Sequence, residues 1–225
     1  EKPRKSVGGY FESRLPSPYT VPNIAATDFL CTPCSFNDSI AKNISLLAGD
    51  SLLELQSNAI ATLANAQIPG QDSWLAVTDW LKNFIESVEK DFDVVFIDTN
   101  PSFSMYTQIA ISASSRLILP IMADDSSRRA IQNVFSLIYG LKLPSSMYSD
   151  YSFTKKLVDA KRVLPKIHLF PKNRLTQYMG PASAYRSVMT SIESLVADEL
   201  KSDPNIFTFS NMDDGFVDIR DFQTT

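Results

Sequence analysis

The stretch DFDVVFIDTNPS, residues 91–102, places four consecutive apolar residues directly before the carboxylate of Asp98. The apolar run has the composition of a buried strand, and the turn that follows it contains proline. In open parallel sheets, ligands bind outside the carboxyl ends of the strands, which is where Asp98 would lie. Two interpretations are open at this point: Asp98 helps to hold Mg²⁺ beside a nucleotide, or it only caps the following turn and helix.

Short apolar runs alternate with longer segments of helical periodicity along the rest of the chain. The candidate strands are residues 44–49, 94–98, 116–122, 166–170 and 205–209. The candidate helices are residues 72–90, 102–114, 124–141 and 181–200. Continuous apolar runs suit strands that are covered on both faces, and the alternation suits right-handed parallel crossovers. The sequence therefore predicts an α/β fold with a mainly parallel sheet and helices on both faces.

Polar residues with good capping ability stand before three of these helices. Asp72 or Ser73 suits the start of the first, and Ser102 or Ser104 the start of the second. The cluster at residues 124–127 suits the start of the third, which has Gly140 near its end.

Length and composition limit the class of protein. The chain has 225 residues, of which 44% are hydrophobic and 20% charged, so we expect residues 1–225 to form one domain with a sizeable core. The net charge of -4 means that any contact with nucleic acid must come from a local basic patch. No apolar run is long enough to span a bilayer and no signal peptide opens the chain, so the expected location is the cytoplasm.

Residues 91–140 resemble a segment of the ParA/MinD-type partition ATPases, in the ParA/Soj branch. The Asp-Thr-x-Pro-Ser turn at 98–102, the helix rich in Ala and Ser, and the strand ending in Leu-Pro-Ile match that family in order and spacing. Residues 6–14, 42–56 and 166–189 are similar to it more loosely. The resemblance implies a P-loop NTPase-like fold of the ParA (SIMIBI) type, with ATP and Mg²⁺ as cofactors.

The resemblance also implies roles for individual residues. Asp98 would be the catalytic carboxylate, associated with Mg²⁺ through a water molecule. Thr99, Asn100 and Pro101 would shape the γ-phosphate side of the nucleotide site. Asn173, which follows the candidate strand at 166–170, could reach the adenine edge, although a plain turn asparagine is an equal alternative.

The deviant Walker A motif of that family, Lys-Gly-Gly-x-Gly-Lys-Thr/Ser, is absent from residues 1–225. VGGY at 7–10 lacks both lysines and follows no apolar strand, so we expect it to be a turn. We therefore expect the chain to be the C-terminal part of a longer ParA-like protein, or a descendant that has lost ATP binding. Residues 1–225 alone should not hydrolyse ATP. They should also not fold stably alone, because residues 94–97 would lack the neighbouring P-loop strand.

The family's partners suggest how basic residues could be used. The resemblance implies a homodimer, nonspecific DNA and a ParB-like centromere-binding protein as partners. The candidate DNA-binding residues are Lys172, Arg174 and Arg186, with further cations at Arg128, Arg129 and in residues 155–162. Solvated helix faces are an equal alternative for all of them. The acidic C-terminus argues against a membrane-targeting helix.

Two further features carry weaker hypotheses. Cys31 and Cys34 form a lone CxxC motif, which could be a redox pair but is more often incidental, and His168 is the only histidine. A packed or edge histidine is expected rather than a catalytic base. As an alternative to the ATPase, the chain could be a non-catalytic ParA-like protein-interaction module.

Overall fold

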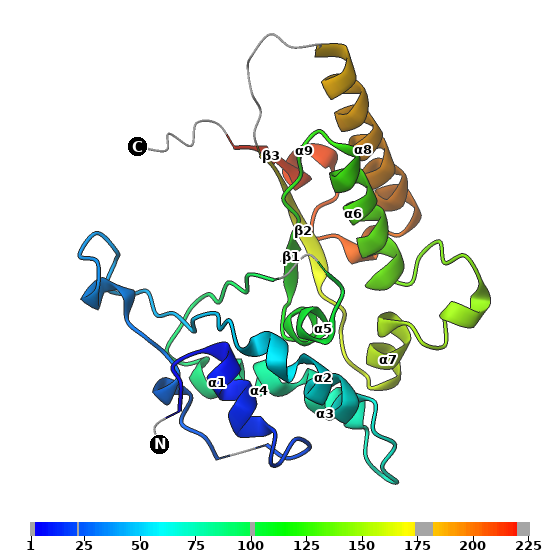
Figure 1. Ribbon diagram of the computed structural model, residues 1–225. Helices are drawn as coiled ribbons and strands as arrows, with labels where there is room; N and C mark the ends of the chain where they lie inside the picture. Colours follow the sequence, from blue (N-terminus) through cyan, green and yellow to red (C-terminus); the bar gives the residue numbers. More distant parts are fainter. Residues whose placement is uncertain (1–2, 22, 100–101, 174–181, 220–225) are drawn as a thin grey trace. The chain divides into compact units, whose positions relative to one another are not determined.

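The computed structural model describes residues 3–21, 23–99, 102–173 and 182–219, with side chains in the last range from residue 186 onward (Figure 1). The chain separates into two compact units, Glu1–Ala113 and Ser114–Thr225. The expectation of a single domain stays a prediction. Among the residues described, none of the helices combines the length and the apolarity that a bilayer crossing requires.

The first unit is helical in its described part. Its helices are α1 (Val7–Arg14), α2 (Leu53–Ala64), α3 (Ser73–Thr78), α4 (Trp80–Val88) and α5 (Met105–Ser112), with short 3₁₀ turns at Ala26–Asp28 and Pro33–Ser35. The core contains aromatic rings from α1 and α4. Tyr10 meets Phe84 at a centroid distance of 4.9 Å, and Phe11 meets Trp80 at 5.6 Å. α1 is therefore a core element of this unit.

The second unit contains the sheet. Its elements are β1 (Arg116–Ile118), α6 (Asp125–Leu137), a 3₁₀ turn η3 (Ser146–Tyr148), α7 (Phe153–Asp159), β2 (Lys166–Lys172), α8 (Ala182–Ser202), a 3₁₀ turn η4 (Pro204–Ile206), α9 (Met212–Gly215) and β3 (Phe216–Asp218). The strands lie in the order β1-β2-β3, and both pairs are parallel. The predicted α/β class with a parallel sheet is confirmed.

The two longest helices of the second unit cover the sheet. In Figure 1, α6 and α8 lie side by side along one face of β1 and β2, and the two helices contact each other. α6 turns Ile131 and Phe135 inward, and α8 turns Ile192 and Val196 inward, at the spacing of a helical stripe. This packing encloses the fully buried Ile167 and Phe170 of β2 and forms the core.

Several predicted helix starts are confirmed. Asp72 begins α3, where its side chain accepts a hydrogen bond from the backbone N–H of Leu75 at 2.9 Å. Asp124 begins α6 and accepts from the N–H of Ser127 at 2.7 Å. Ser104 is the residue before α5. The helix expected over residues 72–90 is present but divided at Asp79 into α3 and α4.

Other local predictions were wrong. Residues 94–98 form no strand, and residues 44–49 contribute one bridge, between Leu46 and Cys31. Strand formation needs a paired neighbour, which an apolar run cannot specify by itself. The expected turn at VGGY is the first part of α1, because Ser6 caps it by accepting from Gly9 N–H. β3, near the acidic C-terminus, was not predicted at all.

Candidate functional site

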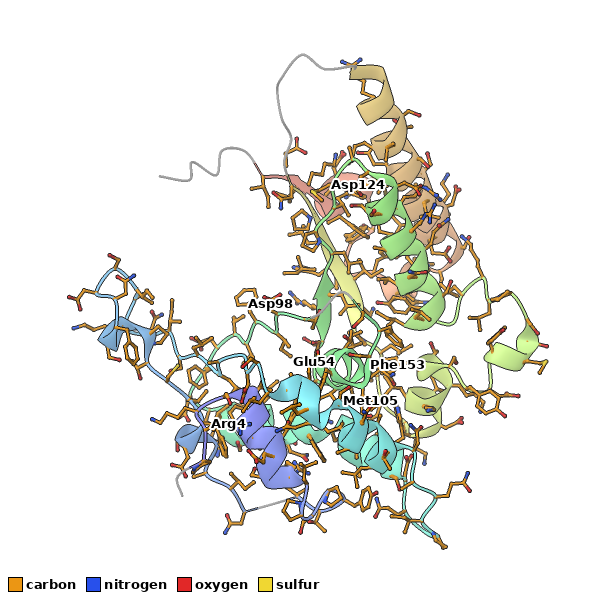
Figure 2. The ribbon with its side chains drawn as sticks, in the orientation of Figure 1. Arg4, Glu54, Asp98, Met105, Asp124 and Phe153 are labelled. Carbon is orange, nitrogen blue, oxygen red and sulfur yellow. The ribbon has the colours of Figure 1, made fainter. Side chains whose placement is uncertain are left out.

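Asp98 lies on the extended segment between α4 and α5 (Figure 2). The residues before it are turned to solvent: Val94 is 66% exposed and Phe96 is 82% exposed. Asp98 itself is exposed, and within the described residues it makes no hydrogen bond or ion pair. Its carboxylate is therefore open to a ligand from outside the unit.

The turn after Asp98 is attached to α5. The hydroxyl of Thr107 on α5 donates a hydrogen bond to the backbone carbonyl of Ser102. Tyr106, in the first turn of the same helix, donates to the carbonyl of Leu53 on α2. The end of the Asp98 turn is thus held by a helix that is itself fixed to the core of the first unit.

The described residues fit a water-mediated Mg²⁺ contact, and they fit no closed metal site. Among them, no group of three or more His, Cys, Asp or Glu side chains could hold a metal ion. Mg²⁺ keeps several waters and needs one or two protein carboxylates when phosphate oxygens complete its shell. A single unpaired carboxylate such as Asp98 suits that role. The phosphate-binding loop itself is not encoded in residues 1–225.

The carboxyl ends of β1, β2 and β3 form the other candidate edge. Lys172, the last residue of β2, lies at its centre, with Nζ 2.8 Å from Glu193 Oε1 on α8 and 3.8 Å from Asp218 Oδ1 on β3. The same ammonium lies 5.3 Å from the centre of the Phe216 ring. Lys172 therefore links three elements of the second unit.

The predicted site residues are divided between the two units. Asp98 and Thr99 belong to the first, where both are exposed. Lys172, Asn173 and Arg186 belong to the second, and Asn173 and Arg186 are exposed there. The backbone N–H of Asn173 donates to the carbonyl of Ile121 at 2.8 Å, which fixes the start of the loop after β2. The nucleotide and DNA roles of these residues stay predictions.

Three other predicted site residues, Asn100, Pro101 and Arg174, lie outside the described residues. The minor candidates are described. Cys31 and Cys34 are free and partly exposed, and the thiol of Cys31 donates to the carbonyl of Leu46. His168 on β2 pairs through Nδ1 with the hydroxyl of Thr208 at 2.7 Å.

Sequence reasoning missed a second polar cluster, in the first unit. Asp50 accepts hydrogen bonds from Ser6 Oγ at 2.7 Å, Arg4 Nε at 2.9 Å and Leu52 N–H at 2.9 Å. These hydrogen bonds, that of Ser6 above all, hold the pKa of the Asp50 carboxyl below its ordinary value of 3.8. The two side-chain partners, Arg4 and Ser6, lie more than 40 residues away in the chain, so no local pattern marked them. The cluster fixes the start of α1.

Comparison with known proteins identifies the class. A family described as "AAA domain" matches residues 28–146, which is more than half of the chain and includes Asp98. The chain belongs to this family, which is of the ParA/MinD-like P-loop type. The confirmed order of α5, β1 and α6 after the Asp98 turn agrees with that membership.

The chain also has a partial sequence match to a bacterial cell division protein. The chain is 30% identical over 73 residues to a protein named cell division protein PomZ, from Myxococcus xanthus (strain DK1622). The match covers 32% of this chain and 23% of PomZ, so the chain spans less than a quarter of that relative. No solved structure matches the chain.

Proposed function

We propose that the intact protein is a ParA-type ATPase of plasmid or chromosome partition. It binds ATP and Mg²⁺, forms a homodimer with nucleotide, and associates with DNA without sequence preference. A ParB-like centromere-binding protein is the partner that this role implies. Family membership and the short match to a cell division protein support the proposal.

The observation that carries the proposal is the unpaired carboxylate of Asp98. It ends an apolar run inside the family match, and the turn after it is held by α5 through Thr107. A carboxylate that served only as a helix cap would accept a backbone hydrogen bond, whereas Asp98 makes none within the described residues. Its charge is therefore available for the waters around a metal ion.

The residues present divide the work of a nucleotide site. Asp98 would hold Mg²⁺ through water, and Thr99 would lie beside the terminal phosphate. The contact of Asn173 with the base is a separate prediction for the second unit. Bound Mg²⁺ supplies charge neutralisation at the β- and γ-phosphates. The lysines and backbone N–H groups of a Walker A loop would have to come from outside residues 1–225.

The test compares Asp98→Ala and Asp98→Asn with a matched control, Asp93→Ala, in the intact protein. Asp93 lies in the same extended segment and is also exposed. We expect both Asp98 variants to lose Mg²⁺-dependent ATP affinity and hydrolysis by about 10-fold or more, since a placed charge at a phosphate site is worth at least that. The control should match the wild type. Equal ATP binding and hydrolysis in Asp98→Ala and wild type would refute the assignment.

A second candidate function is a non-catalytic interaction module with a ParA-like fold. The two functions differ in the motif Lys-Gly-Gly-x-Gly-Lys-Thr/Ser, which an ATPase of this type requires and which does not occur in residues 1–225. Reading the codons upstream of Glu1 tests it, because an in-frame copy of that motif would exclude this function. Failure of the intact protein to bind ATP with Mg²⁺ would instead support it.

A further inference from the structure

Positive charge is concentrated in residues 142–166, which we call the basic segment. It contains six lysine or arginine residues and two aspartates, for a net charge of +4 in a chain whose total is -4. The cations are Lys142, Lys155, Lys156, Lys161, Arg162 and Lys166. The basic segment includes η3 and α7 and lies within the second unit. The rest of the chain is therefore more acidic than its total suggests.

The basic segment also exposes aromatic rings. Tyr148 in η3 is 59% exposed, and Tyr151, just before α7, is 81% exposed. The apolar side chains that α7 does bury are Phe153 and Leu157, which face the protein. The outer surface of the segment thus presents ammonium groups and phenol hydroxyls, both of which can donate to phosphate oxygens, together with the exposed apolar side chains of Met147, Val158 and Val163.

Part of the charge in the basic segment is already compensated. Lys155 pairs with Asp159 at 2.8 Å, and Lys142 pairs with the buried Glu199 at 2.5 Å. Lys161 and Lys166 are exposed, and neither has a side-chain partner among the described residues. These two lysines are the groups best able to meet an external anion.

Lys161 has an unusual backbone as well as a free side chain. It has φ +56°, in the left-handed region that favours glycine, and it closes α7 by donating its N–H to the carbonyl of Val158. Arg162 N–H donates to the carbonyl of Leu157 in the same turn. Among the described non-glycine residues only Lys142 and Lys161 have positive φ, and both are lysines of the basic segment. A lysine at a backbone position that favours glycine indicates that its side chain has a functional role there.

We propose that the basic segment is the surface through which this protein contacts the phosphate backbone of duplex DNA, with Lys161 and Lys166 as phosphate contacts and the exposed hydroxyls of Tyr148 and Tyr151 as further donors of the same segment. The inference rests on the proposed function for DNA association and adds the place where it occurs. Such contacts carry no sequence information, so binding is nonspecific and depends on salt. The segment also exposes Met147, Val158 and Val163, so tighter binding to an anionic membrane is the outcome that would overturn the inference.

The experiment measures duplex DNA affinity of the intact protein with ATP and Mg²⁺ over a range of salt concentrations. The central variant is Lys161→Gly, because glycine suits φ +56° and the change removes the charge while the helix end is kept. Its melting temperature should stay within about 3 °C of the wild type. DNA affinity at 0.1 M salt should fall by about 5- to 10-fold, and the slope of log K against log salt should fall by about 0.9.

Three further variants make the result specific. Lys161→Gly with Lys166→Gln should lower the slope by about 1.8, twice the single effect. Lys161→Arg should keep the wild-type affinity. Lys90→Gln, an exposed lysine in the first unit, is the matched control and should leave both affinity and slope unchanged.

The outcomes separate this inference from the proposed function. If the wild type binds DNA and the double variant binds equally well with the same slope, the surface lies elsewhere and the proposed function survives. If the wild type binds no DNA even at low salt, both fail. Tighter binding of the wild type to vesicles rich in phosphatidylserine than to DNA would also overturn the inference.

Discussion

The rings of Phe170 on β2 and Phe216 on β3 stack across neighbouring parallel strands, with centroids 4.9 Å apart and planes inclined by 17°. Phe170 is fully buried, whereas Phe216 is partly exposed and lies below the ammonium of Lys172. The two residues are direct partners in the register of the strands. This contact attaches the last strand of the described chain to the core of the second unit.

Truncating the two rings should have unequal effects. Phe170→Ala should lower the free energy of unfolding by about 3–5 kcal/mol, because it empties a fully buried site. Phe216→Ala should cost less, since part of its ring is already in solvent. Urea denaturation of both single variants and the double variant should give a coupling energy of about 0.5–1.5 kcal/mol. If the changes in unfolding free energy of the two single variants add up to that of the double variant, the stacked geometry contributes nothing to stability.

Gly9 in α1 should not tolerate a side chain. A Cβ added there would overlap the backbone carbonyl oxygen of Arg4, so the chain entering the helix would have to move. Gly9→Ala should cost about 1–3 kcal/mol of stability in spite of the better helix propensity of alanine. Gly49→Ala is the control, because no atom lies within 4 Å of its added Cβ, and thermal unfolding should show little change there.

Asp50 should make stability depend on pH in the acid range. Its pKa lies below 3.8 because Ser6, Leu52 and Arg4 donate hydrogen bonds to the ionised carboxylate. A lowered pKa in the folded state gives stability that is present above the unfolded value and lost as the pH falls through the folded value. Unfolding free energy should therefore drop below about pH 3.8, and Asp50→Asn should flatten this drop.

Tyr106 should make the free energy of unfolding fall as the pH rises in the alkaline range. Burial, with a smaller contribution from the nearby Glu54 carboxylate, raises the pKa of its phenol to about 12. The unfolded chain ionises near 10.0, so the neutral folded form is favoured and its stabilisation is lost as the pH rises from 10.0 to about 12. Tyr106→Phe should remove one late-ionising group from an ultraviolet absorbance titration. A titration identical to the wild type would contradict the assignment.

The parts of the fold that follow local rules were predictable from sequence. Asp72 and Asp124 precede periodic segments, and each caps the helix that follows it. The apolar runs that became β1 and β2 are long enough to be recognised. β3 has three residues in an acidic stretch, and it exists because Phe216 stacks on Phe170 and its backbone pairs with β2, which is tertiary information.

The candidate site divides in the same way. Asp98 could be singled out from sequence because its apolar run and turn are contiguous, and its role in a nucleotide site stays a prediction. The ion pairs of Lys172 could not be predicted from sequence, because Glu193 and Asp218 come from two later elements that meet only in the folded unit. The strand expected at residues 94–98 failed for a related reason: periodicity can indicate that a segment is able to pair, whereas pairing also needs a partner strand.

The exposed run at residues 94–97 has a consequence for handling the chain in solution. Val94, Val95 and Phe96 are 66%, 46% and 82% exposed in an extended backbone that contains no proline, which is the composition of a segment prone to cross-β stacking between molecules. Asp93 and Asp98 stand directly on either side and act as gatekeepers, because in-register stacking would align their like charges. In any preparation where this run stays uncovered, those two aspartates are what opposes fibril formation, and exchanging both for asparagine would remove that protection.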